Sequence, residues 1–188
     1  DNFKKQKITK VVIDLRNNPG GRVDAVLEML SFFAKPTDTV LTIRKRKESK
    51  VIKAEDLPGA QINAQIEFNF SGHSNTVTLA PINQDNGIKN LKIVVLINEG
   101  SASASEIFAG TMKDWGYPIV GQNSYGKGVG QDVIILSDGG RLALTTFEFL
   151  VGNHAVPIRD KGIEPTVEVK AKPGKHRRDV QLEAAIKI

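Results

Sequence analysis

Residues 10–36 read KVVIDLRNNPGGRVDAVLEMLSFFAKP, and this stretch decides the fold class. The apolar residues at 11–15, interrupted once by an aspartate, form the run expected of a strand that is covered on both faces. The segment NNPGG at 17–21 breaks the run. Apolar residues then recur at helical spacing from Val23 to Phe33, and Pro36 ends the pattern. The stretch therefore predicts a strand, a tight turn and a helix.

A second unit repeats this pattern further along the chain. Residues 93–97, IVVLI, predict another buried strand, and NEG at 98–100 predicts a turn. Apolar residues at 104–115 then favour a helix that stops at Gly116. Strands that alternate with helices indicate an α/β sheet, in which loops at the carboxyl ends of parallel strands form sites. We therefore expect the turns at 17–21 and 100–103 to lie on one sheet edge.

The remaining chain is rich in strand signals. Apolar runs at 133–136 and 142–149 predict two strands joined across the turn sequence SDGG. The polar region 44–90 contains an alternating stretch at 66–70, which indicates a β-hairpin insertion or arm. A third apolar stretch at 119–120 leads into a glycine-punctuated segment at 121–130, and a short helical stretch is expected near residues 182–186.

Composition excludes several classes of chemistry. The chain of 188 residues has no cysteine, which excludes a thiol nucleophile and cysteine-ligated metal sites. It has only three histidines, so few residues could serve in a histidine metal site or a histidine-based catalytic triad. The net charge of +5 permits an acidic partner, but few aromatic residues accompany the basic runs, so nucleic-acid binding is not expected. The sequence has no run of eighteen apolar residues, so it predicts no membrane-spanning helix. Because the first residue is Asp1, we expect a piece of a longer protein.

The segment GSASASE at 100–106 places small residues and hydroxyls at the predicted start of the second helix. A serine there can be a helix cap, the more common role for any one serine, or a nucleophile stabilised by free backbone N–H groups. A nucleophile needs a base. His154 is the only histidine in question, and its neighbours suggest a loop. Lys127, between two glycines, is the better candidate, since burial can lower the pKa of a lysine toward neutrality.

Two other motifs overlap this lysine. Residues 121–127, GQNSYGK, fit the first seven positions of a phosphate-binding P-loop, but Gly128 stands where a serine or threonine should hold magnesium, and a β-rich run follows in place of a helix. Ser124 and Lys127 match the S-x-x-K spacing of penicillin-binding enzymes, yet the glycines argue against the helix that this motif needs. We therefore reject the P-loop and place Ser124 well below Ser103 as a nucleophile.

Three blocks of the sequence together resemble the signature blocks of the carboxy-terminal processing (tail-specific) serine peptidases: VIDLRNNPGG at 12–21, NEGSASASEI at 98–107 and YGKGVGQ at 125–131. Two further stretches resemble later blocks of that family: KGIEP at 161–165 and the closing residues 179–186. The resemblance covers most of residues 10–188. It implies a crotonase/Clp-protease-like core of stacked βα units with a β-hairpin insertion.

The resemblance also implies roles for individual residues. Ser103 is expected to be the nucleophile and Lys127 the general base, with Gln131 orienting the lysine. The N–H of Ala104 is expected to be one donor of the oxyanion hole. The other donor is expected from the glycine pair at 20–21, with the choice between Gly20 and Gly21 left open.

The resemblance extends to domain organisation. Residues 1–188 are expected to be a peptidase catalytic domain fragment, with the β-rich insertion at 44–90 within it. Family members usually carry a PDZ domain ahead of this region, so we expect that domain to lie upstream of residue 1. An extracytoplasmic location, periplasmic or membrane-associated in a bacterium, is implied by the resemblance alone.

The leading hypothesis is a serine endopeptidase that cuts proteins near their C-termini through a Ser–Lys dyad and an acyl-enzyme intermediate. Its partners would be protein or peptide substrates with accessible C-termini, and it would need no metal or other cofactor. The alternative is a catalytically inactive binding module of the same fold, as illustrated by retinoid-binding proteins of the eye. An acyl-CoA enzyme of the related crotonase-like fold is a third interpretation, but its chemistry would not need the serine and lysine together.

Overall fold

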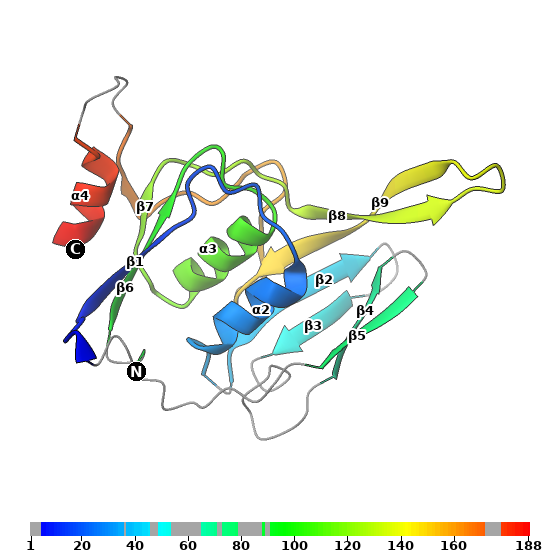
Figure 1. Cartoon of the computed structure of the whole chain (residues 1–188), viewed down its shortest axis with the longest axis horizontal. Helices are drawn as coiled ribbons and strands as arrows, with labels where there is room; N and C mark the ends of the chain where they lie inside the picture. The colour runs from blue at the N-terminus through cyan, green and yellow to red at the C-terminus, as the bar shows by residue number, and fades with distance from the viewer. Residues whose placement is uncertain are drawn as a thin grey trace.

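The computed structural model describes most of the chain: residues 5–35, 37–45, 49–53, 65–70, 73–78, 88, 91–171 and 178–188. Its core has two sheets with two helices between them (Figure 1). None of the helices in these ranges is long and apolar enough to cross a membrane.

The first sheet has four parallel strands in the order β1-β6-β7-β11: β1 (Lys10–Asp14), β6 (Lys92–Ile97), β7 (Ile119–Gly121) and β11 (Val167–Glu168). β1 and β6 confirm the two strands that the apolar runs predict, and β7 contains the third apolar stretch. β1 and β6 are neighbours, with Val12 opposite Val94. The turns that follow these two strands therefore leave the same edge of the sheet.

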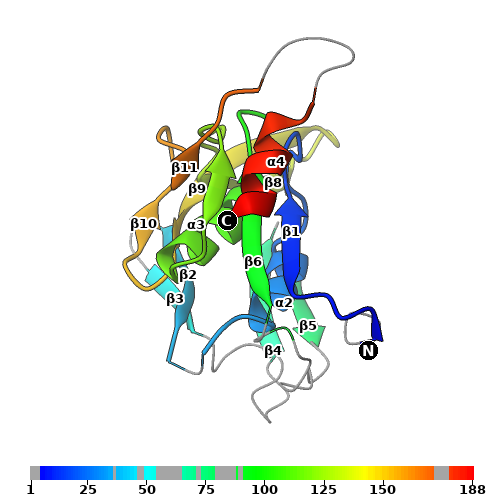
Figure 2. The ribbon, with the colours of Figure 1, turned by 90° about the vertical axis from the view of Figure 1, so that its left-hand side faces the viewer.

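Helices cover both faces of this sheet. α2 (Val23–Ser31) and α3 (Ala104–Asp114) pack on one face, and α4 (Val180–Lys187) packs on the other, across β6, β7 and β1 (Figure 2). The alternation of side chains along β6 explains why its run is apolar throughout. Val95 joins the core under α2 and α3, whereas Val94 and Leu96 join a smaller cluster with Ala185 of α4.

The second sheet is antiparallel and lies on the far side of α2 and α3 (Figure 1). Its five strands are β2 (Thr39–Lys45), β3 (Ser49–Lys53), β8 (Val129–Ile135), β9 (Arg141–Val151) and β10 (Val156–Pro157). β9 is the central strand, since it pairs with β2, β8 and β10. The tip of the β8–β9 hairpin extends away from the body of the protein (Figure 1).

Several boundaries differ from those that the sequence predicts. β8 begins at Val129, inside the glycine-punctuated segment, because pairing with β9 extends the strand toward Lys127. α2 ends at Ser31, and Pro36 lies outside the described residues. In the region 44–90, β3 belongs to the second sheet, while β4 (Gln65–Phe70) and β5 (His73–Thr78) form the predicted separate hairpin.

Candidate active site

The turns after β1 and β6 lie against each other, as the sequence predicts. The backbone N–H of Asn17 donates to Oδ1 of Asn98 at 2.8 Å, and Nδ2 of Asn98 donates back to Oδ1 of Asn17 at 2.9 Å. The N–H of Ala102 donates to the carbonyl of Asn18 at 3.0 Å. These bonds fix the turn at residues 100–103, called the serine turn below, against the NNPGG turn.

Ser103 stands at the N-terminus of α3 in an unusual backbone conformation. Its φ is 57° and its ψ is −117°, a region that L-residues rarely adopt and that costs about 1–3 kcal/mol. An ordinary N-cap serine has β-region angles, so capping alone does not explain this geometry. A sharp, strained strand-to-helix turn is instead typical of a serine nucleophile held with its hydroxyl exposed.

Gly20 packs directly against this turn. A Cβ atom on Gly20 would lie 2.5 Å from the carbonyl oxygen of Ala102 and 2.7 Å from the backbone nitrogen of Ala104, and the φ of Gly20 is +95°. Only glycine fits this position. The N–H of Gly20 donates to Oδ1 of Asn18 at 2.9 Å. Among the described residues, neither the N–H of Gly21 nor that of Ala104 has an acceptor, so both are available to a ligand.

A buried carboxylate joins the serine turn to the loop at residues 124–128, called the lysine loop below. Glu106 is 0% exposed, and its Oε2 accepts the backbone N–H groups of Ser103 and Lys127, each at 2.8 Å. The two backbone nitrogens can therefore be no farther apart than twice that distance. Oε1 accepts from the Ser124 hydroxyl and the N–H of Gly126, each at 2.6 Å. Four donors thus compensate the desolvation of one buried charge.

The side chains of Lys127 and Gln131 are both exposed. The expectation of a lysine amine sheltered from water is therefore wrong: the side chain of Lys127 is exposed, although its backbone N–H is held by the buried Glu106. Gln131 follows a register shift in the β8–β9 pairing, which lies between Gly130 and Gln131. Such bulges re-aim side chains at the edges of sites.

The other candidates occupy structural positions. Ser124 is buried, donates to Glu106 and accepts the N–H of Ile163 at 2.6 Å, so its hydroxyl is fully engaged. His154 lies 2.7 Å from Asp114 at the C-terminal end of α3. Eleven residues of helix, about 16 Å, separate that end from Ser103. The structure therefore gives neither residue a place at the serine turn.

Glu106 is the site residue that the sequence analysis does not single out. The available signal is its position three residues after a serine at a helix start, which is typical of a capping box. That pattern cannot reveal the bonds to Gly126 and Lys127, because they cross between segments. Among the described residues, no group of His, Asp or Glu side chains could hold a metal ion.

Comparisons with known proteins show which family the chain is similar to. The sequence model of Peptidase family S41 matches residues 1–169. The chain is 32% identical over 166 residues to a probable CtpA-like serine protease of Staphylococcus epidermidis, covering 88% of the chain and 28% of that protein. It is 32% identical over 187 residues to the carboxy-terminal processing protease CtpB of Bacillus subtilis, covering 99% of the chain and 33% of that protein. The chain thus spans about a third of these relatives.

Solved structures with the same fold include the photosystem II D1 C-terminal processing protease. The TM-score is 0.64 at 26% identity, and the match covers 90% of this chain and 36% of that one. A lipoprotein from Streptococcus agalactiae has a TM-score of 0.66 over 99% of this chain and 56% of its own, at 19% identity, which is a likeness of fold alone. These neighbours agree with the expected Clp-protease-like core of stacked βα units.

Proposed function

This chain belongs to peptidase family S41, and we propose that it carries the catalytic centre of a serine endopeptidase that cuts proteins near their C-termini. One observation carries the proposal. Ser103 adopts a strained conformation at the start of α3, and its backbone shares the Oε2 atom of Glu106 with the backbone of Lys127. The bond from the Ser103 N–H to Glu106 is also half of a capping box, but a helix cap needs neither the strained conformation nor the second bond from Lys127.

The proposed chemistry is acyl transfer. Oγ of Ser103 attacks the scissile carbonyl carbon while the neutral amine of Lys127 takes the hydroxyl proton. When the C–N bond breaks, the resulting ammonium group returns a proton to the leaving amine, and an ester on Ser103 remains. Water then attacks the ester with the same base, which releases the carboxylic acid and regenerates the serine.

The oxyanion of each tetrahedral intermediate needs preorganised N–H donors. The N–H of Ala104 is one, at the N-terminus of α3. For the second donor the bonding in this structure favours Gly21 over Gly20, because the Gly20 N–H is already engaged by Asn18 whereas that of Gly21 has no acceptor among the described residues. Gly20 then serves as the residue that lets the two turns approach.

A bound polypeptide lying across the serine turn excludes water from Ser103 and Lys127, which strengthens the hydrogen bond through which the amine takes the hydroxyl proton. Gln131, near the start of β8, holds the amine toward Ser103 in that state.

The test compares matched variants in the cleavage of an unstructured protein such as reduced casein. We expect Ser103→Ala and Lys127→Ala to abolish cleavage, whereas Ser105→Ala, on the same helix end, and Lys113→Ala should cleave as the wild type does. Cleavage by Ser103→Ala at the wild-type rate would refute the assignment. EDTA should leave the rate unchanged.

The exposure of Lys127 also fits a second candidate, a binding module of the same fold without hydrolytic activity. The two functions differ in what happens to a bound peptide. A binding module would hold casein fragments without shortening them, and Ser103→Ala would leave their affinity unchanged. A peptidase would shorten them, and Ser103→Ala would convert turnover into stable binding.

We propose that the substrates are proteins or peptides with accessible C-termini, since two of the similar proteins are named as C-terminal processing proteases. Blocking the C-terminus of a test peptide as its amide should slow its cleavage if this preference holds. We place the action outside the cytoplasm on the family resemblance. Fractionation of the producing cells would test this, and a cytoplasmic pool that holds all of the protein would contradict it.

A further inference from the structure

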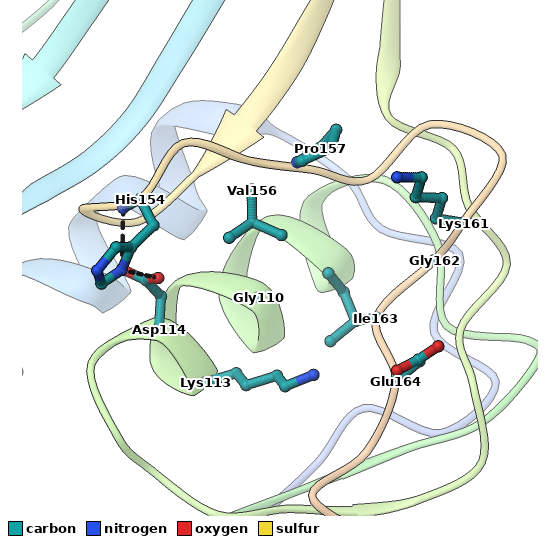
Figure 3. Close-up of a pocket in the computed structure, with 10 residues that line it drawn as sticks. All are labelled: Gly110, Lys113, Asp114, His154, Val156, Pro157, Lys161, Gly162, Ile163 and Glu164. Atoms are coloured by element: carbon teal, nitrogen blue, oxygen red, sulfur yellow. Dashed lines mark hydrogen bonds and ion pairs between the residues drawn. The ribbon is translucent and has the colours of Figure 1, made fainter.

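A cavity of about 450 Å³ lies beside α3, away from the serine turn (Figure 3). Its walls are the C-terminal half of α3, the turn after β9 with β10, and the loop at 161–164. Apolar groups of Val156, Pro157 and Ile163 line it. Cavities of about 300–1,000 Å³ with apolar walls and a few polar groups are typical small-ligand sites.

The charged groups at the cavity are unequally satisfied. Asp114 is nearly buried, and its carboxylate is held by Nδ1 of His154 at 2.7 Å and by the N–H of Asn153 at 2.5 Å. Lys113 and Lys161 have no ion-pair partner among the described residues. In Figure 3 they reach toward the cavity from different walls, with one further carboxylate, Glu164, at its side.

We propose that this cavity binds a carboxylate attached to an apolar chain. Lys113 and Lys161 have no ion-pair partner in the described part of the chain, so the carboxylate of a ligand can pair with either, whereas the carboxylate of Asp114 is already held by His154 and Asn153. The apolar side chains of Val156 and Ile163 would together cover the apolar tail of the ligand. A fatty acid and the C-terminal residue of a peptide both have this chemistry.

One wall of the cavity, the loop at 161–164, is hydrogen-bonded to the lysine loop. The N–H of Ile163 donates to the hydroxyl of Ser124 at 2.6 Å, and the N–H of Ser124 donates to the carbonyl of Ile163 at 3.2 Å. The same hydroxyl donates to Glu106, which accepts the N–H groups of Gly126 and Lys127. A ligand against Ile163 therefore stabilises the bonds that hold the proposed catalytic lysine loop. The regulatory meaning of this link, unlike the binding itself, rests on the proposed function.

Calorimetric titration of the chain with hexanoate and with N-acetyl-Ala-Leu tests the binding and distinguishes the two ligand sources. Hexanamide and the dipeptide amide are the neutral controls. We expect at least one carboxylate to bind about tenfold tighter than its amide, which corresponds to about 1.4 kcal/mol. Equal binding of acid and amide, or no binding of either acid, would overturn the proposal.

Variants locate the site. Lys113→Gln combined with Lys161→Gln should weaken carboxylate binding about tenfold, while the matched pair Lys92→Gln and Lys187→Gln, which removes the same charge elsewhere, should not. Val156→Trp, which fills the cavity from an exposed position, should abolish binding and leave thermal unfolding near that of the wild type. Wild-type affinity in the first double variant and in Val156→Trp would place the ligand elsewhere and overturn the assignment.

Amide hydrogen exchange tests the link to the lysine loop without any need for activity. With ligand at a hundred times its Kd, openings that require its release become about a hundredfold rarer. Exchange at Gly126 and Lys127 should slow accordingly in the wild type and in Ser103→Ala alike. Unchanged exchange at these two amides at saturation would refute the link. Because this readout does not depend on catalysis, its failure is distinct from failure of the proposed peptidase activity.

Discussion

Replacing Glu106 by glutamine should uncouple the serine turn from the lysine loop. The carboxylate has two acceptor oxygens, each with two donors: Ser103 and Lys127 on one, Ser124 and Gly126 on the other. A carboxamide keeps one acceptor oxygen and presents an NH₂ group to the other pair of donors. Whichever way the amide turns, two donors lose their shared charged acceptor in a site with no exposure to water.

The magnitude follows from that count. A buried donor left without an acceptor costs about 1–3 kcal/mol, so two cost about 2–6 kcal/mol of unfolding free energy. Domains of ordinary stability have only about 5–15 kcal/mol in total. For a chain of this size the lower value corresponds to a fall in Tm of at least about 4 °C.

Urea unfolding followed by circular dichroism measures the loss, with Glu99→Gln as the matched control. Glu99 is an exposed glutamate in the turn before the same helix, and its variant should stay within about 0.5 kcal/mol of the wild type. Peptidase activity of Glu106→Gln should fall further than its folded fraction does. A Glu106→Gln protein as stable as Glu99→Gln would refute the account of the four-donor carboxylate.

Two further predictions concern the turns and the docking of α4. Gly20→Ala should lower the unfolding free energy by about 2–4 kcal/mol, because the new Cβ would meet the Ala102 carbonyl oxygen at a residue with φ of +95°. The control Gly21→Ala has open space around the new Cβ and should lower the unfolding free energy far less. Equal losses in the two variants would contradict the packing of Gly20 against the serine turn. Arg16 lowers the pKa of Asp179 to about 2, chiefly by hydrogen bonding, so this carboxylate contributes stability above its unfolded pKa of about 3.9 that is lost as the pH falls through 2. Since Asp179 is well exposed, that contribution is below about 1 kcal/mol. The variant Arg16→Met should lose this contribution. If its unfolding free energy depended on pH between 4 and 2 as strongly as that of the wild type, the pairing of Arg16 with Asp179 would be contradicted.

The apolar runs and turn signals were enough to predict the meeting of the two turns. Two strands of the VVI and IVVLI type, each followed by a turn and a helix, have few arrangements other than adjacent parallel strands. The sequence therefore brings Gly20 and Ser103 to one edge without any structural information. It could not decide whether Ser103 is a cap or a nucleophile, because both roles use the same residue type. The difference lies in its φ of 57°, in a turn against which Gly20 packs closely, and local sequence patterns do not reveal this angle.

Other features depend on contacts between distant segments. β3 joins the second sheet by pairing with β2, and β2 pairs with β9 about a hundred residues later, so local patterns in the region 44–90 could not predict this sheet. The backbone N–H of Lys127 is bonded to Glu106, 21 residues earlier in the chain, a contact that spacing alone does not reveal. In both cases the sequence identifies the residues themselves but not the distant residues with which they pair.

The most direct test of the Ser103–Lys127 dyad is to locate the acyl group during turnover. The chain is mixed with an activated peptide ester, quenched in acid within the first turnover, digested and analysed by mass spectrometry. The account predicts an acyl adduct on Ser103 that forms at least a hundredfold more slowly in Lys127→Ala. An adduct on another residue, or acylation of Ser103 at the wild-type rate in Lys127→Ala, would contradict it.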